Sequence, residues 1–253
     1  MTRAAAVRPA AVDSAGGSAA SWLNVYFKRS ELPLHSLVFL LPAMVLFEIG
    51  TSVNRADPIA FRMLELFFHQ LGATGRFIPF LFVTGILLVW HMVRKDPWKV
   101  RLETLWGMLL ESCMLAIPLL ALGAGVARWN IHVPLFAGAG QWRDNAVLSL
   151  GAGIYEEFVF RMILMTLISM VLADLLIVHK SLSNLLMVLI SAVLFSLYHY
   201  LGSEAFQLRS FVFRTGAGIY FAGLFLTRGF GVTAGCHIAY DIAIVTIQAF
   251  APH

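Results

Sequence analysis

The stretch GAGIYEEFVFR, residues 151–161, places two adjacent glutamates and an arginine inside a long apolar run. The run covers about residues 146–174, which is long enough for a helix that crosses a lipid bilayer. An ionisable side chain at the centre of a membrane costs about 2.5–3.5 kcal/mol on insertion scales. Charges in this position therefore require partners or a function.

The composition of the whole chain is that of a membrane protein. Of the 253 residues, 59% are hydrophobic and 13% are charged, and the mean hydropathy is +0.80. A soluble domain has about 45–50% apolar and about 25% charged residues. The net charge of +4 comes from Lys and Arg residues between the apolar runs, where they set the orientation of membrane helices. We therefore expect an all-α, polytopic transmembrane helical bundle in a lipid bilayer, with no nucleic acid as a partner.

Seven apolar runs have the length of a membrane span, with six to eight as the expected range. They lie at about residues 35–53, 77–93, 104–127, 146–174, 182–201, 211–227 and 231–250. Residues 58–72 alternate apolar and polar side chains at helical spacing, which predicts a short interfacial helix.

The runs form one membrane domain, residues 31–253, which follows a tail of residues 1–30. The first twenty residues are rich in Ala, Arg, Ser and Gly and lack the uninterrupted apolar core of a cleavable signal peptide. We expect the tail to be disordered or interfacial. The chain is expected to be an integral, multi-pass protein of the bacterial inner (cytoplasmic) membrane.

The two glutamates of the opening stretch face different directions on a helix. Glu157 and Arg161 are four residues apart, so they share a face and can form an ion pair. Glu156 is rotated by about 100° from Glu157 and cannot use the same arginine from the same direction. We interpret Glu157 and Arg161 as structural support and Glu156 as the reactive group. A charge network that only holds helices together is the competing interpretation.

Two further polar motifs lie in later spans. FSLYH, residues 195–199, places His199 at the end of one span, and HIAYD, residues 237–241, places His237 and Asp241 on one face of another. A carboxylate beside a histidine fixes the tautomer of the ring and favours its charged form. A bundle can gather these side chains with Glu156 in one polar chamber.

Two kinds of chemistry suit this set of residues. A glutamate and a histidine can activate water as a general base, while a second histidine stabilises an oxyanion, which is a hydrolytic combination. Glu156, His199, His237 and Asp241 are also the residue types that ligate a divalent metal such as zinc. The HExxH pattern of zinc proteases is absent.

In this order, the motifs EEFVFR (156–161), FSLYH (195–199) and HIAYD (237–241) resemble those of the CPBP family of intramembrane proteases, also described as the ABI domain. This family includes the type II CAAX prenyl endopeptidases. The resemblance covers about residues 145–250, the expected protease core. It implies a helical membrane fold and hydrolysis of a peptide bond in a membrane-associated or lipidated peptide or protein, with no required metal.

The resemblance also implies roles for particular residues. Glu156 would be the catalytic carboxylate, His199 would help it to activate water, and His237 with the residue at position 241 would support the oxyanion. Many family members carry Asn at the last position, whereas this chain carries Asp241. An Asp can donate a hydrogen bond only when protonated, and when ionised it would instead orient and charge His237.

Two alternatives to a glutamic endopeptidase remain open from the sequence. One is a non-catalytic membrane protein of the same fold, with an immunity or scaffold function, although such a protein would be expected to lose at least one of the ionisable residues. The other is a proton-coupled transporter with Glu156, His199 and Asp241 as a relay. Such transporters often contain inverted repeats, and the sequence shows none.

Overall fold

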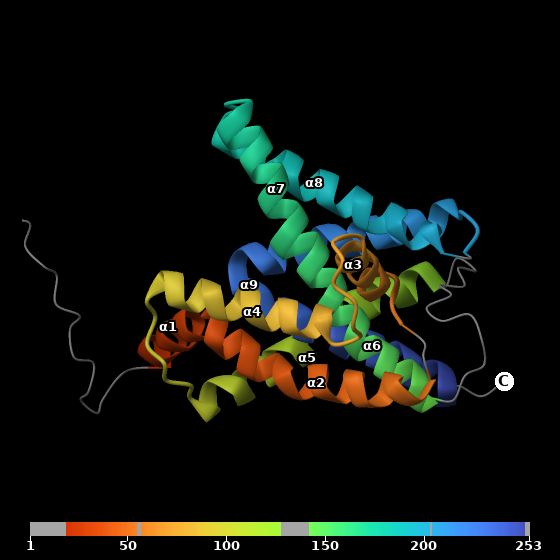
Figure 1. The fold of residues 1–253 in the computed structure, drawn as a ribbon, viewed down its shortest axis with the longest axis horizontal. Coiled ribbons are helices and arrows are strands. Elements are labelled where there is room, and N and C mark those ends of the chain that lie inside the picture. The colour runs from red at the N-terminus through yellow and green to blue at the C-terminus, as the bar shows by residue number, and fades with distance from the viewer. Residues whose placement is uncertain (1–18, 55–56, 128–141, 203, 251–253) are drawn as a thin grey trace, which may run out of the picture.

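The computed structural model describes residues 19–54, 57–127, 142–202 and 204–250, in which helices are joined by short connections and no strand occurs (Figure 1). The longer helices are α1 (Ala19–Ser30), α2 (Pro33–Asn54), α3 (Ile59–Gln70), α4 (Ile78–Arg94), α5 (Leu102–Ala127), α6 (Trp142–Glu157), α8 (Lys180–Tyr198) and α9 (Leu208–Phe250). The shorter pieces are the π-helix η1 (Phe158–Leu164), α7 (Met165–Ser169), the π-helix η2 (Met170–Leu175) and the 3-10 helix η3 (His199–Leu201).

The helices have the lengths of membrane spans. Five are long and apolar enough to cross a bilayer: Pro33–Ser52, Leu102–Gly125, Trp142–Leu175, Lys180–Leu201 and Leu208–Phe250. The second predicted span corresponds to the shorter apolar helix α4. The prediction of an all-α, multi-pass membrane bundle is therefore confirmed.

The last of these spans is a helical hairpin. Gly229 has φ 75° and ψ −178°, a conformation that is essentially restricted to glycine. The rings of Phe213 and Tyr240 lie 6.4 Å apart, although 27 residues of straight helix would separate them by about 40 Å. The two halves of α9 therefore run side by side, and they match the predicted spans 211–227 and 231–250.

The outer faces of the helices are apolar, as lipid requires. Leu110, Met114 and Ile117 of α5 are 60–68% exposed and follow one another at helical spacing along one side. The short helix α3 buries Ala60, Phe61 and Leu64 and leaves apolar side chains exposed elsewhere. The helix predicted for residues 58–72 is thus present. It packs one side against the bundle and exposes the other, as a helix at the membrane interface does.

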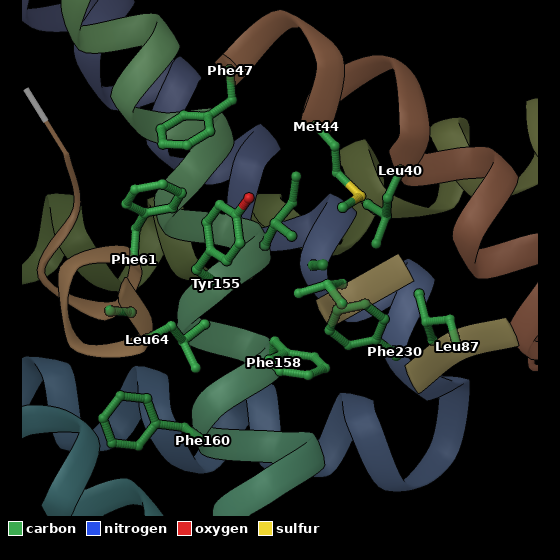
Figure 2. Packing of buried hydrophobic residues seen from close by; sticks show 14 of the residues in the cluster. Leu40, Met44, Phe47, Phe61, Leu64, Leu87, Tyr155, Phe158, Phe160 and Phe230 are labelled. Carbon is green, nitrogen blue, oxygen red and sulfur yellow. The ribbon is translucent and has the colours of Figure 1, made fainter. Parts of the chain in front are cut away.

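An aromatic core fixes α6 in the centre of the bundle. The rings of Phe47 from α2, Phe61 from α3 and Tyr155 from α6 pack against one another with centroids 5.0–5.5 Å apart (Figure 2). Phe158, in the next turn, meets Phe230 at 6.3 Å. Offset and edge-on contacts of this kind are worth about 0.5–1.5 kcal/mol each beyond their buried area. The end of α6, which carries both glutamates, is therefore held from two sides.

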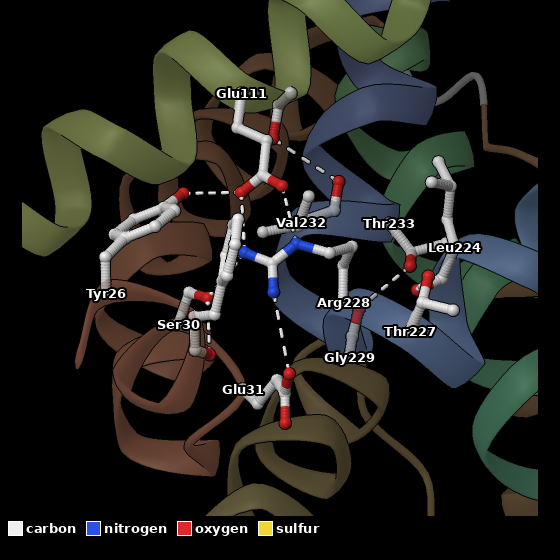
Figure 3. A network of polar contacts seen from close by, with 12 residues as sticks. Tyr26, Ser30, Glu31, Glu111, Leu224, Thr227, Arg228, Gly229, Val232 and Thr233 are labelled. Atoms are coloured by element: carbon white, nitrogen blue, oxygen red, sulfur yellow. Dashed lines mark hydrogen bonds and ion pairs between the residues drawn. The ribbon is translucent and has the colours of Figure 1, made fainter. Parts of the chain in front are cut away.

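A polar cluster ties α1 to the turn of the α9 hairpin (Figure 3). Arg228 donates to both carboxylate oxygens of Glu111 in α5, at 2.5 and 2.8 Å, and to Ser30 Oγ at 2.9 Å. Tyr26 donates to Glu111 at 2.5 Å. Desolvation by burial and the Glu111 carboxylate raise the pKa of the Tyr26 hydroxyl, so this donor keeps its proton. The boundary expected at residue 30, between an N-terminal tail and the membrane domain, stays a prediction. Residues 1–18 of that tail lie outside the described residues.

Candidate functional site

The last two residues of α6, Glu156 and Glu157, lie in the interior of the bundle. Every residue from Gly151 to Glu157 is buried. The helix then widens into the π-helical turns of η1, which contain Arg161. Single π-helical turns occur frequently at functional sites, because the extra residue in the turn shifts side chains relative to a regular helix.

Glu157 and Arg161 form the buried ion pair that the sequence predicts. Arg161 Nε lies 3.0 Å from Glu157 Oε2, and both side chains are fully buried. Arg161 also donates from Nη1 to Ser191 Oγ of α8 at 3.2 Å, and its guanidinium lies over the ring of Phe195 at 4.9 Å. The arginine thereby connects η1 to α8.

Glu156 points toward both motif histidines. Its Oε1 accepts a hydrogen bond from the Tyr198 hydroxyl at 2.7 Å. Its Oε2 lies 3.8 Å from Nε2 of His199 and 3.9 Å from Nε2 of His237. This Oε2 is buried and has no hydrogen-bond partner among the described residues. One oxygen of the carboxylate is thus anchored, and the other faces the two imidazoles.

His199 is held in one tautomer by its own helix. Its Nδ1 lies 2.8 Å from the carbonyl oxygen of Phe195, which can only accept, so Nδ1 carries a proton. In the neutral ring the Nε2 that faces Glu156 then has a free lone pair. The His199 side chain is 21% exposed, whereas that of Glu156 is 7% exposed, so the site opens on the His199 side.

His237 lies between three carboxylates. Its Nδ1 is 2.9 Å from Glu157 Oε1, and its Nε2 faces Glu156 and Asp241 Oδ2, the latter at 3.6 Å. The ring of Phe221, from the other half of the α9 hairpin, stacks on the imidazole at 4.6 Å with an interplanar angle of 19°. Both halves of the α9 hairpin therefore contribute to the position of His237.

A glycine lets α6 approach α9 closely enough for these contacts. A Cβ atom on Gly153 would lie 2.8 Å from the backbone nitrogen of Ile238 and 3.1 Å from the carbonyl oxygen of Ala234. Neither backbone atom can move away without disturbing the packed helix α9. Gly153 is one turn before Glu156 and Glu157, so the close approach brings them to His237.

The structure brings all six predicted residues into one cluster, from α6, η1, η3 and α9. Tyr198, the residue before His199, is also buried and donates a hydrogen bond to Glu156. Phe221 and Ser191 were not predicted, because nothing in a single sequence shows which ring or hydroxyl of one helix meets another helix. Glu157 also contacts His237 directly, in addition to the support expected for it.

The same four side chains were considered as metal ligands. Among the described residues, no group of three or more His, Cys, Asp or Glu side chains has an arrangement that would hold a metal ion. The four candidates nevertheless include the residue types that zinc prefers. Metal dependence therefore stays a question for experiment.

Comparison with known proteins gives a match to a protein-family model. The family model described as Rce1-like, type II CAAX prenyl endopeptidase Rce1-like, matches residues 139–243. This range contains all three motifs and every residue of the cluster. Neither the curated proteins nor the solved structures contain a match to the chain.

Proposed function

Because residues 139–243 form a Rce1-like type II CAAX prenyl endopeptidase domain, we propose that this chain is an intramembrane endopeptidase of the glutamic type. Its substrate would be a membrane-associated or lipidated peptide or protein, and its location would be the bacterial inner membrane. The observation that carries the proposal is the buried Glu156 Oε2, which faces Nε2 of both His199 and His237 at 3.8 and 3.9 Å.

In this mechanism Glu156 and His199 activate water. Tyr198 holds Oε1, so Oε2 is the oxygen that accepts a proton from water. The lone pair on His199 Nε2 provides a second acceptor beside it, since Nδ1 is committed to the Phe195 carbonyl. Two acceptors aimed at one small region orient the attacking oxygen, which general base catalysis requires.

His237 would stabilise the oxyanion that forms when water attacks the peptide carbonyl. Its Nδ1–H donates to Glu157, whose charge is balanced by Arg161, so donation from Nε2 requires that the ring carry both protons. The three surrounding carboxylates attract that positive charge. Asp241, at 3.6 Å from Nε2, would hold the ring ready for the oxyanion.

A divalent metal such as zinc is the alternative for the same residues. Glu156, His199, His237 and Asp241 would then supply its ligands, and the metal would lower the pKa of a bound water. The glutamic mechanism requires no metal or other cofactor. A chelator separates the two mechanisms.

The test compares wild-type protein with Glu156→Gln in detergent, on membrane-anchored and prenylated peptides, with and without a strong chelator. The matched control is Glu103→Gln, which alters an exposed glutamate of α5 that pairs with Arg101. We expect cleavage by the wild type and by the control, and none by Glu156→Gln. Cleavage that persists in chelator supports the glutamic mechanism over the metal.

Other outcomes would point elsewhere. Equal cleavage by wild type and Glu156→Gln would exclude Glu156 as the base. A scaffold protein would cleave nothing in either form. A transporter would instead lose proton-coupled uptake into proteoliposomes in the Glu156→Gln variant, while no peptide is cut.

A further inference from the structure

A third buried glutamate supports α6 from the side that faces α2. Glu48 of α2 accepts a hydrogen bond at Oε1 from the Tyr155 hydroxyl, at 3.2 Å. Its other oxygen, Oε2, lies 3.8 Å from Nε of Arg76, and the Glu48 side chain is 7% exposed. Neither this oxygen nor this nitrogen has a hydrogen-bond partner among the described residues. Within that part of the chain, the carboxylate therefore depends on Tyr155 for its hydrogen bond.

Arg76 connects this carboxylate to the start of α3. Its Nη1 and Nη2 donate to the two carboxylate oxygens of Asp57 at 3.3 and 2.8 Å, and Asp57 lies two residues before α3. The guanidinium also lies over the ring of Phe61 at 5.4 Å. The contacts thus run from α6 through α2 to α3, and the arginine has partners of its own besides Glu48.

Tyr155 and Gly153 fix nearly opposite faces of α6. Two residues along a helix turn by about 200°, so Tyr155 points away from the α9 backbone that Gly153 approaches. The Tyr155 ring packs against those of Phe47 and Phe61, with centroids 5.5 and 5.0 Å away. Ring contacts permit some sliding, whereas the directional hydrogen bond to Glu48 holds the hydroxyl in one place.

The rotation of this last turn of α6 determines where Glu156 points. Glu156 directly follows Tyr155, and the π-helical turns of η1 begin at Phe158. Because the regular hydrogen-bond pattern of α6 changes there, the side-chain contacts of the turn help to set its rotation. A carboxylate about 6 Å from the helix axis moves by about 1 Å when the helix rotates by about 10°. A displacement of that size between reacting groups can lower a rate by about 100-fold.

We propose that Glu48 is a positioning residue for the reaction: through Tyr155 it holds Glu156 toward the two motif histidines. A buried ion pair is often no more stabilising than apolar residues of similar volume, so stability gives little reason for a carboxylate inside this spanning helix. The orientation of the neighbouring helix supplies that reason. This inference rests on the proposed function.

The competing use of Glu48 is to fasten α2 to α6 without any effect on the site. In that case its replacement would lower the free energy of unfolding, while the folded protein would cleave its substrate at the rate of the wild type. The turnover number of the folded protein and the state of the two histidines therefore separate the two uses.

Four single changes differ in what they leave at this hydrogen bond. Tyr155→Phe removes the donor, Glu48→Leu removes the acceptor, and Glu48→Gln removes the charge but keeps an amide oxygen that can accept. The control is Thr51→Val in the same helix, because the buried Thr51 hydroxyl donates to the carbonyl of Phe47 within α2. Steady-state kinetics on a cleaved peptide gives kcat and KM, and unfolding in mixed micelles gives the stability of each variant.

We expect kcat to fall about tenfold to 100-fold in Tyr155→Phe and in Glu48→Leu, with KM changed by less than about twofold, because the contacts with substrate remain. Glu48→Gln should retain about a third or more of kcat, and Thr51→Val should match the wild type. The double change Glu48→Leu/Tyr155→Phe should be no slower than the slower single variant, since both changes break the same bond. A wild-type kcat in Tyr155→Phe, or an equal fall in Thr51→Val, would overturn the positioning role.

A second measurement does not require turnover. Histidine with isotope-labelled ring nitrogens is followed by NMR in micelles, and the signals of His199 and His237 are assigned with His199→Gln and His237→Gln. The resonance of a ring nitrogen responds to the tautomer and to the charge beside it. We expect both signals to move in Tyr155→Phe and Glu48→Leu and to stay in place in Thr51→Val. Unchanged signals in Tyr155→Phe would overturn the inference even if no peptide is cleaved, whereas absence of cleavage by the wild type would count against the proposed function alone.

Discussion

Nδ1 of His237 lies 2.9 Å from Oε1 of Glu157, and the same carboxylate pairs with Arg161 through Oε2. One glutamate therefore links the α9 histidine to the π-helical turn that follows α6. The neighbouring Glu156 faces the two histidines with its Oε2. Both glutamates approach His237, Glu157 at Nδ1 and Glu156 at Nε2. Glu157 is held by Arg161, whereas Oε2 of Glu156 has no hydrogen-bond partner among the described residues, so Glu157 can stay fixed while Glu156 exchanges a proton.

The first prediction concerns the stability of this link. Glu157→Gln leaves the buried Arg161 guanidinium without its charge partner, which we expect to cost about 3–5 kcal/mol of unfolding free energy. Reversible unfolding in mixed micelles measures it. The double change Glu157→Gln/Arg161→Gln should cost less than the sum of the two single changes, because it leaves no unpaired ion.

Asp57→Asn is the control for this prediction. It breaks the more exposed pair with Arg76, so its cost should be no more than about 1 kcal/mol. If Glu157→Gln were no more destabilising than Asp57→Asn, the buried pair would not be the support that its geometry indicates.

The second prediction concerns the contact between α6 and α9 at Gly153. In Gly153→Ala the new methyl group meets the backbone of Ile238 and Ala234, so the helices must separate. A displacement of about 1 Å between reacting groups can lower a rate by about 100-fold, and we expect kcat/KM to fall by that order. Gly85→Ala in α4 has no atom within 4 Å of the added Cβ and should be stabilising by about 0.5–1 kcal/mol, with activity retained. Full activity in Gly153→Ala would contradict the close approach.

The third prediction concerns the turn of the α9 hairpin. Gly229→Ala places a side chain at φ 75°, ψ −178°, and such strain costs about 1–3 kcal/mol. The cost should appear in the unfolding free energy, together with reduced activity, because the hairpin places Phe221 on His237. Gly223→Ala, in the helical part of the same span, has open space around the new Cβ and should lack both effects. Equal behaviour of the two variants would mean that the turn tolerates a side chain.

Much of the fold could be predicted from the sequence because helices that face lipid are apolar over the length of a span, and such runs are visible in the hydropathy of the sequence. The predicted span 35–53 corresponds to Pro33–Ser52, and 182–201 to Lys180–Leu201. The two halves of α9 were separable because Arg228 and its neighbours interrupt the apolar run. Each of these features depends on residues that are adjacent in the chain.

For the site, the sequence could predict which residues take part but not most of the contacts between them. Spacing along one helix predicted the pairing of Glu157 with Arg161, since four residues return to the same face. The contact of Glu157 with His237 depends on how closely two helices approach at Gly153, and the anchoring of Glu156 by Tyr198 depends on the rotation of α8. Such relations between helices are set by packing, which no periodicity in a single sequence records.

The last prediction concerns the hydroxyl that anchors Glu156. In Tyr198→Phe the ring remains packed against Phe160 at 4.9 Å, while the hydrogen bond to Oε1 is lost. Without it the carboxylate can rotate away from the histidines, so we expect kcat to fall about tenfold or more while KM changes little, because the hydroxyl acts on Glu156 and not on the substrate. Tyr200→Phe, two residues later, removes only a hydrogen bond to the carbonyl of Gln207 and should retain kcat. Steady-state kinetics on a cleaved peptide measures both. A fall in kcat of equal size in the two variants would show that the loss reflects disturbance of this end of α8 rather than the anchor on Glu156.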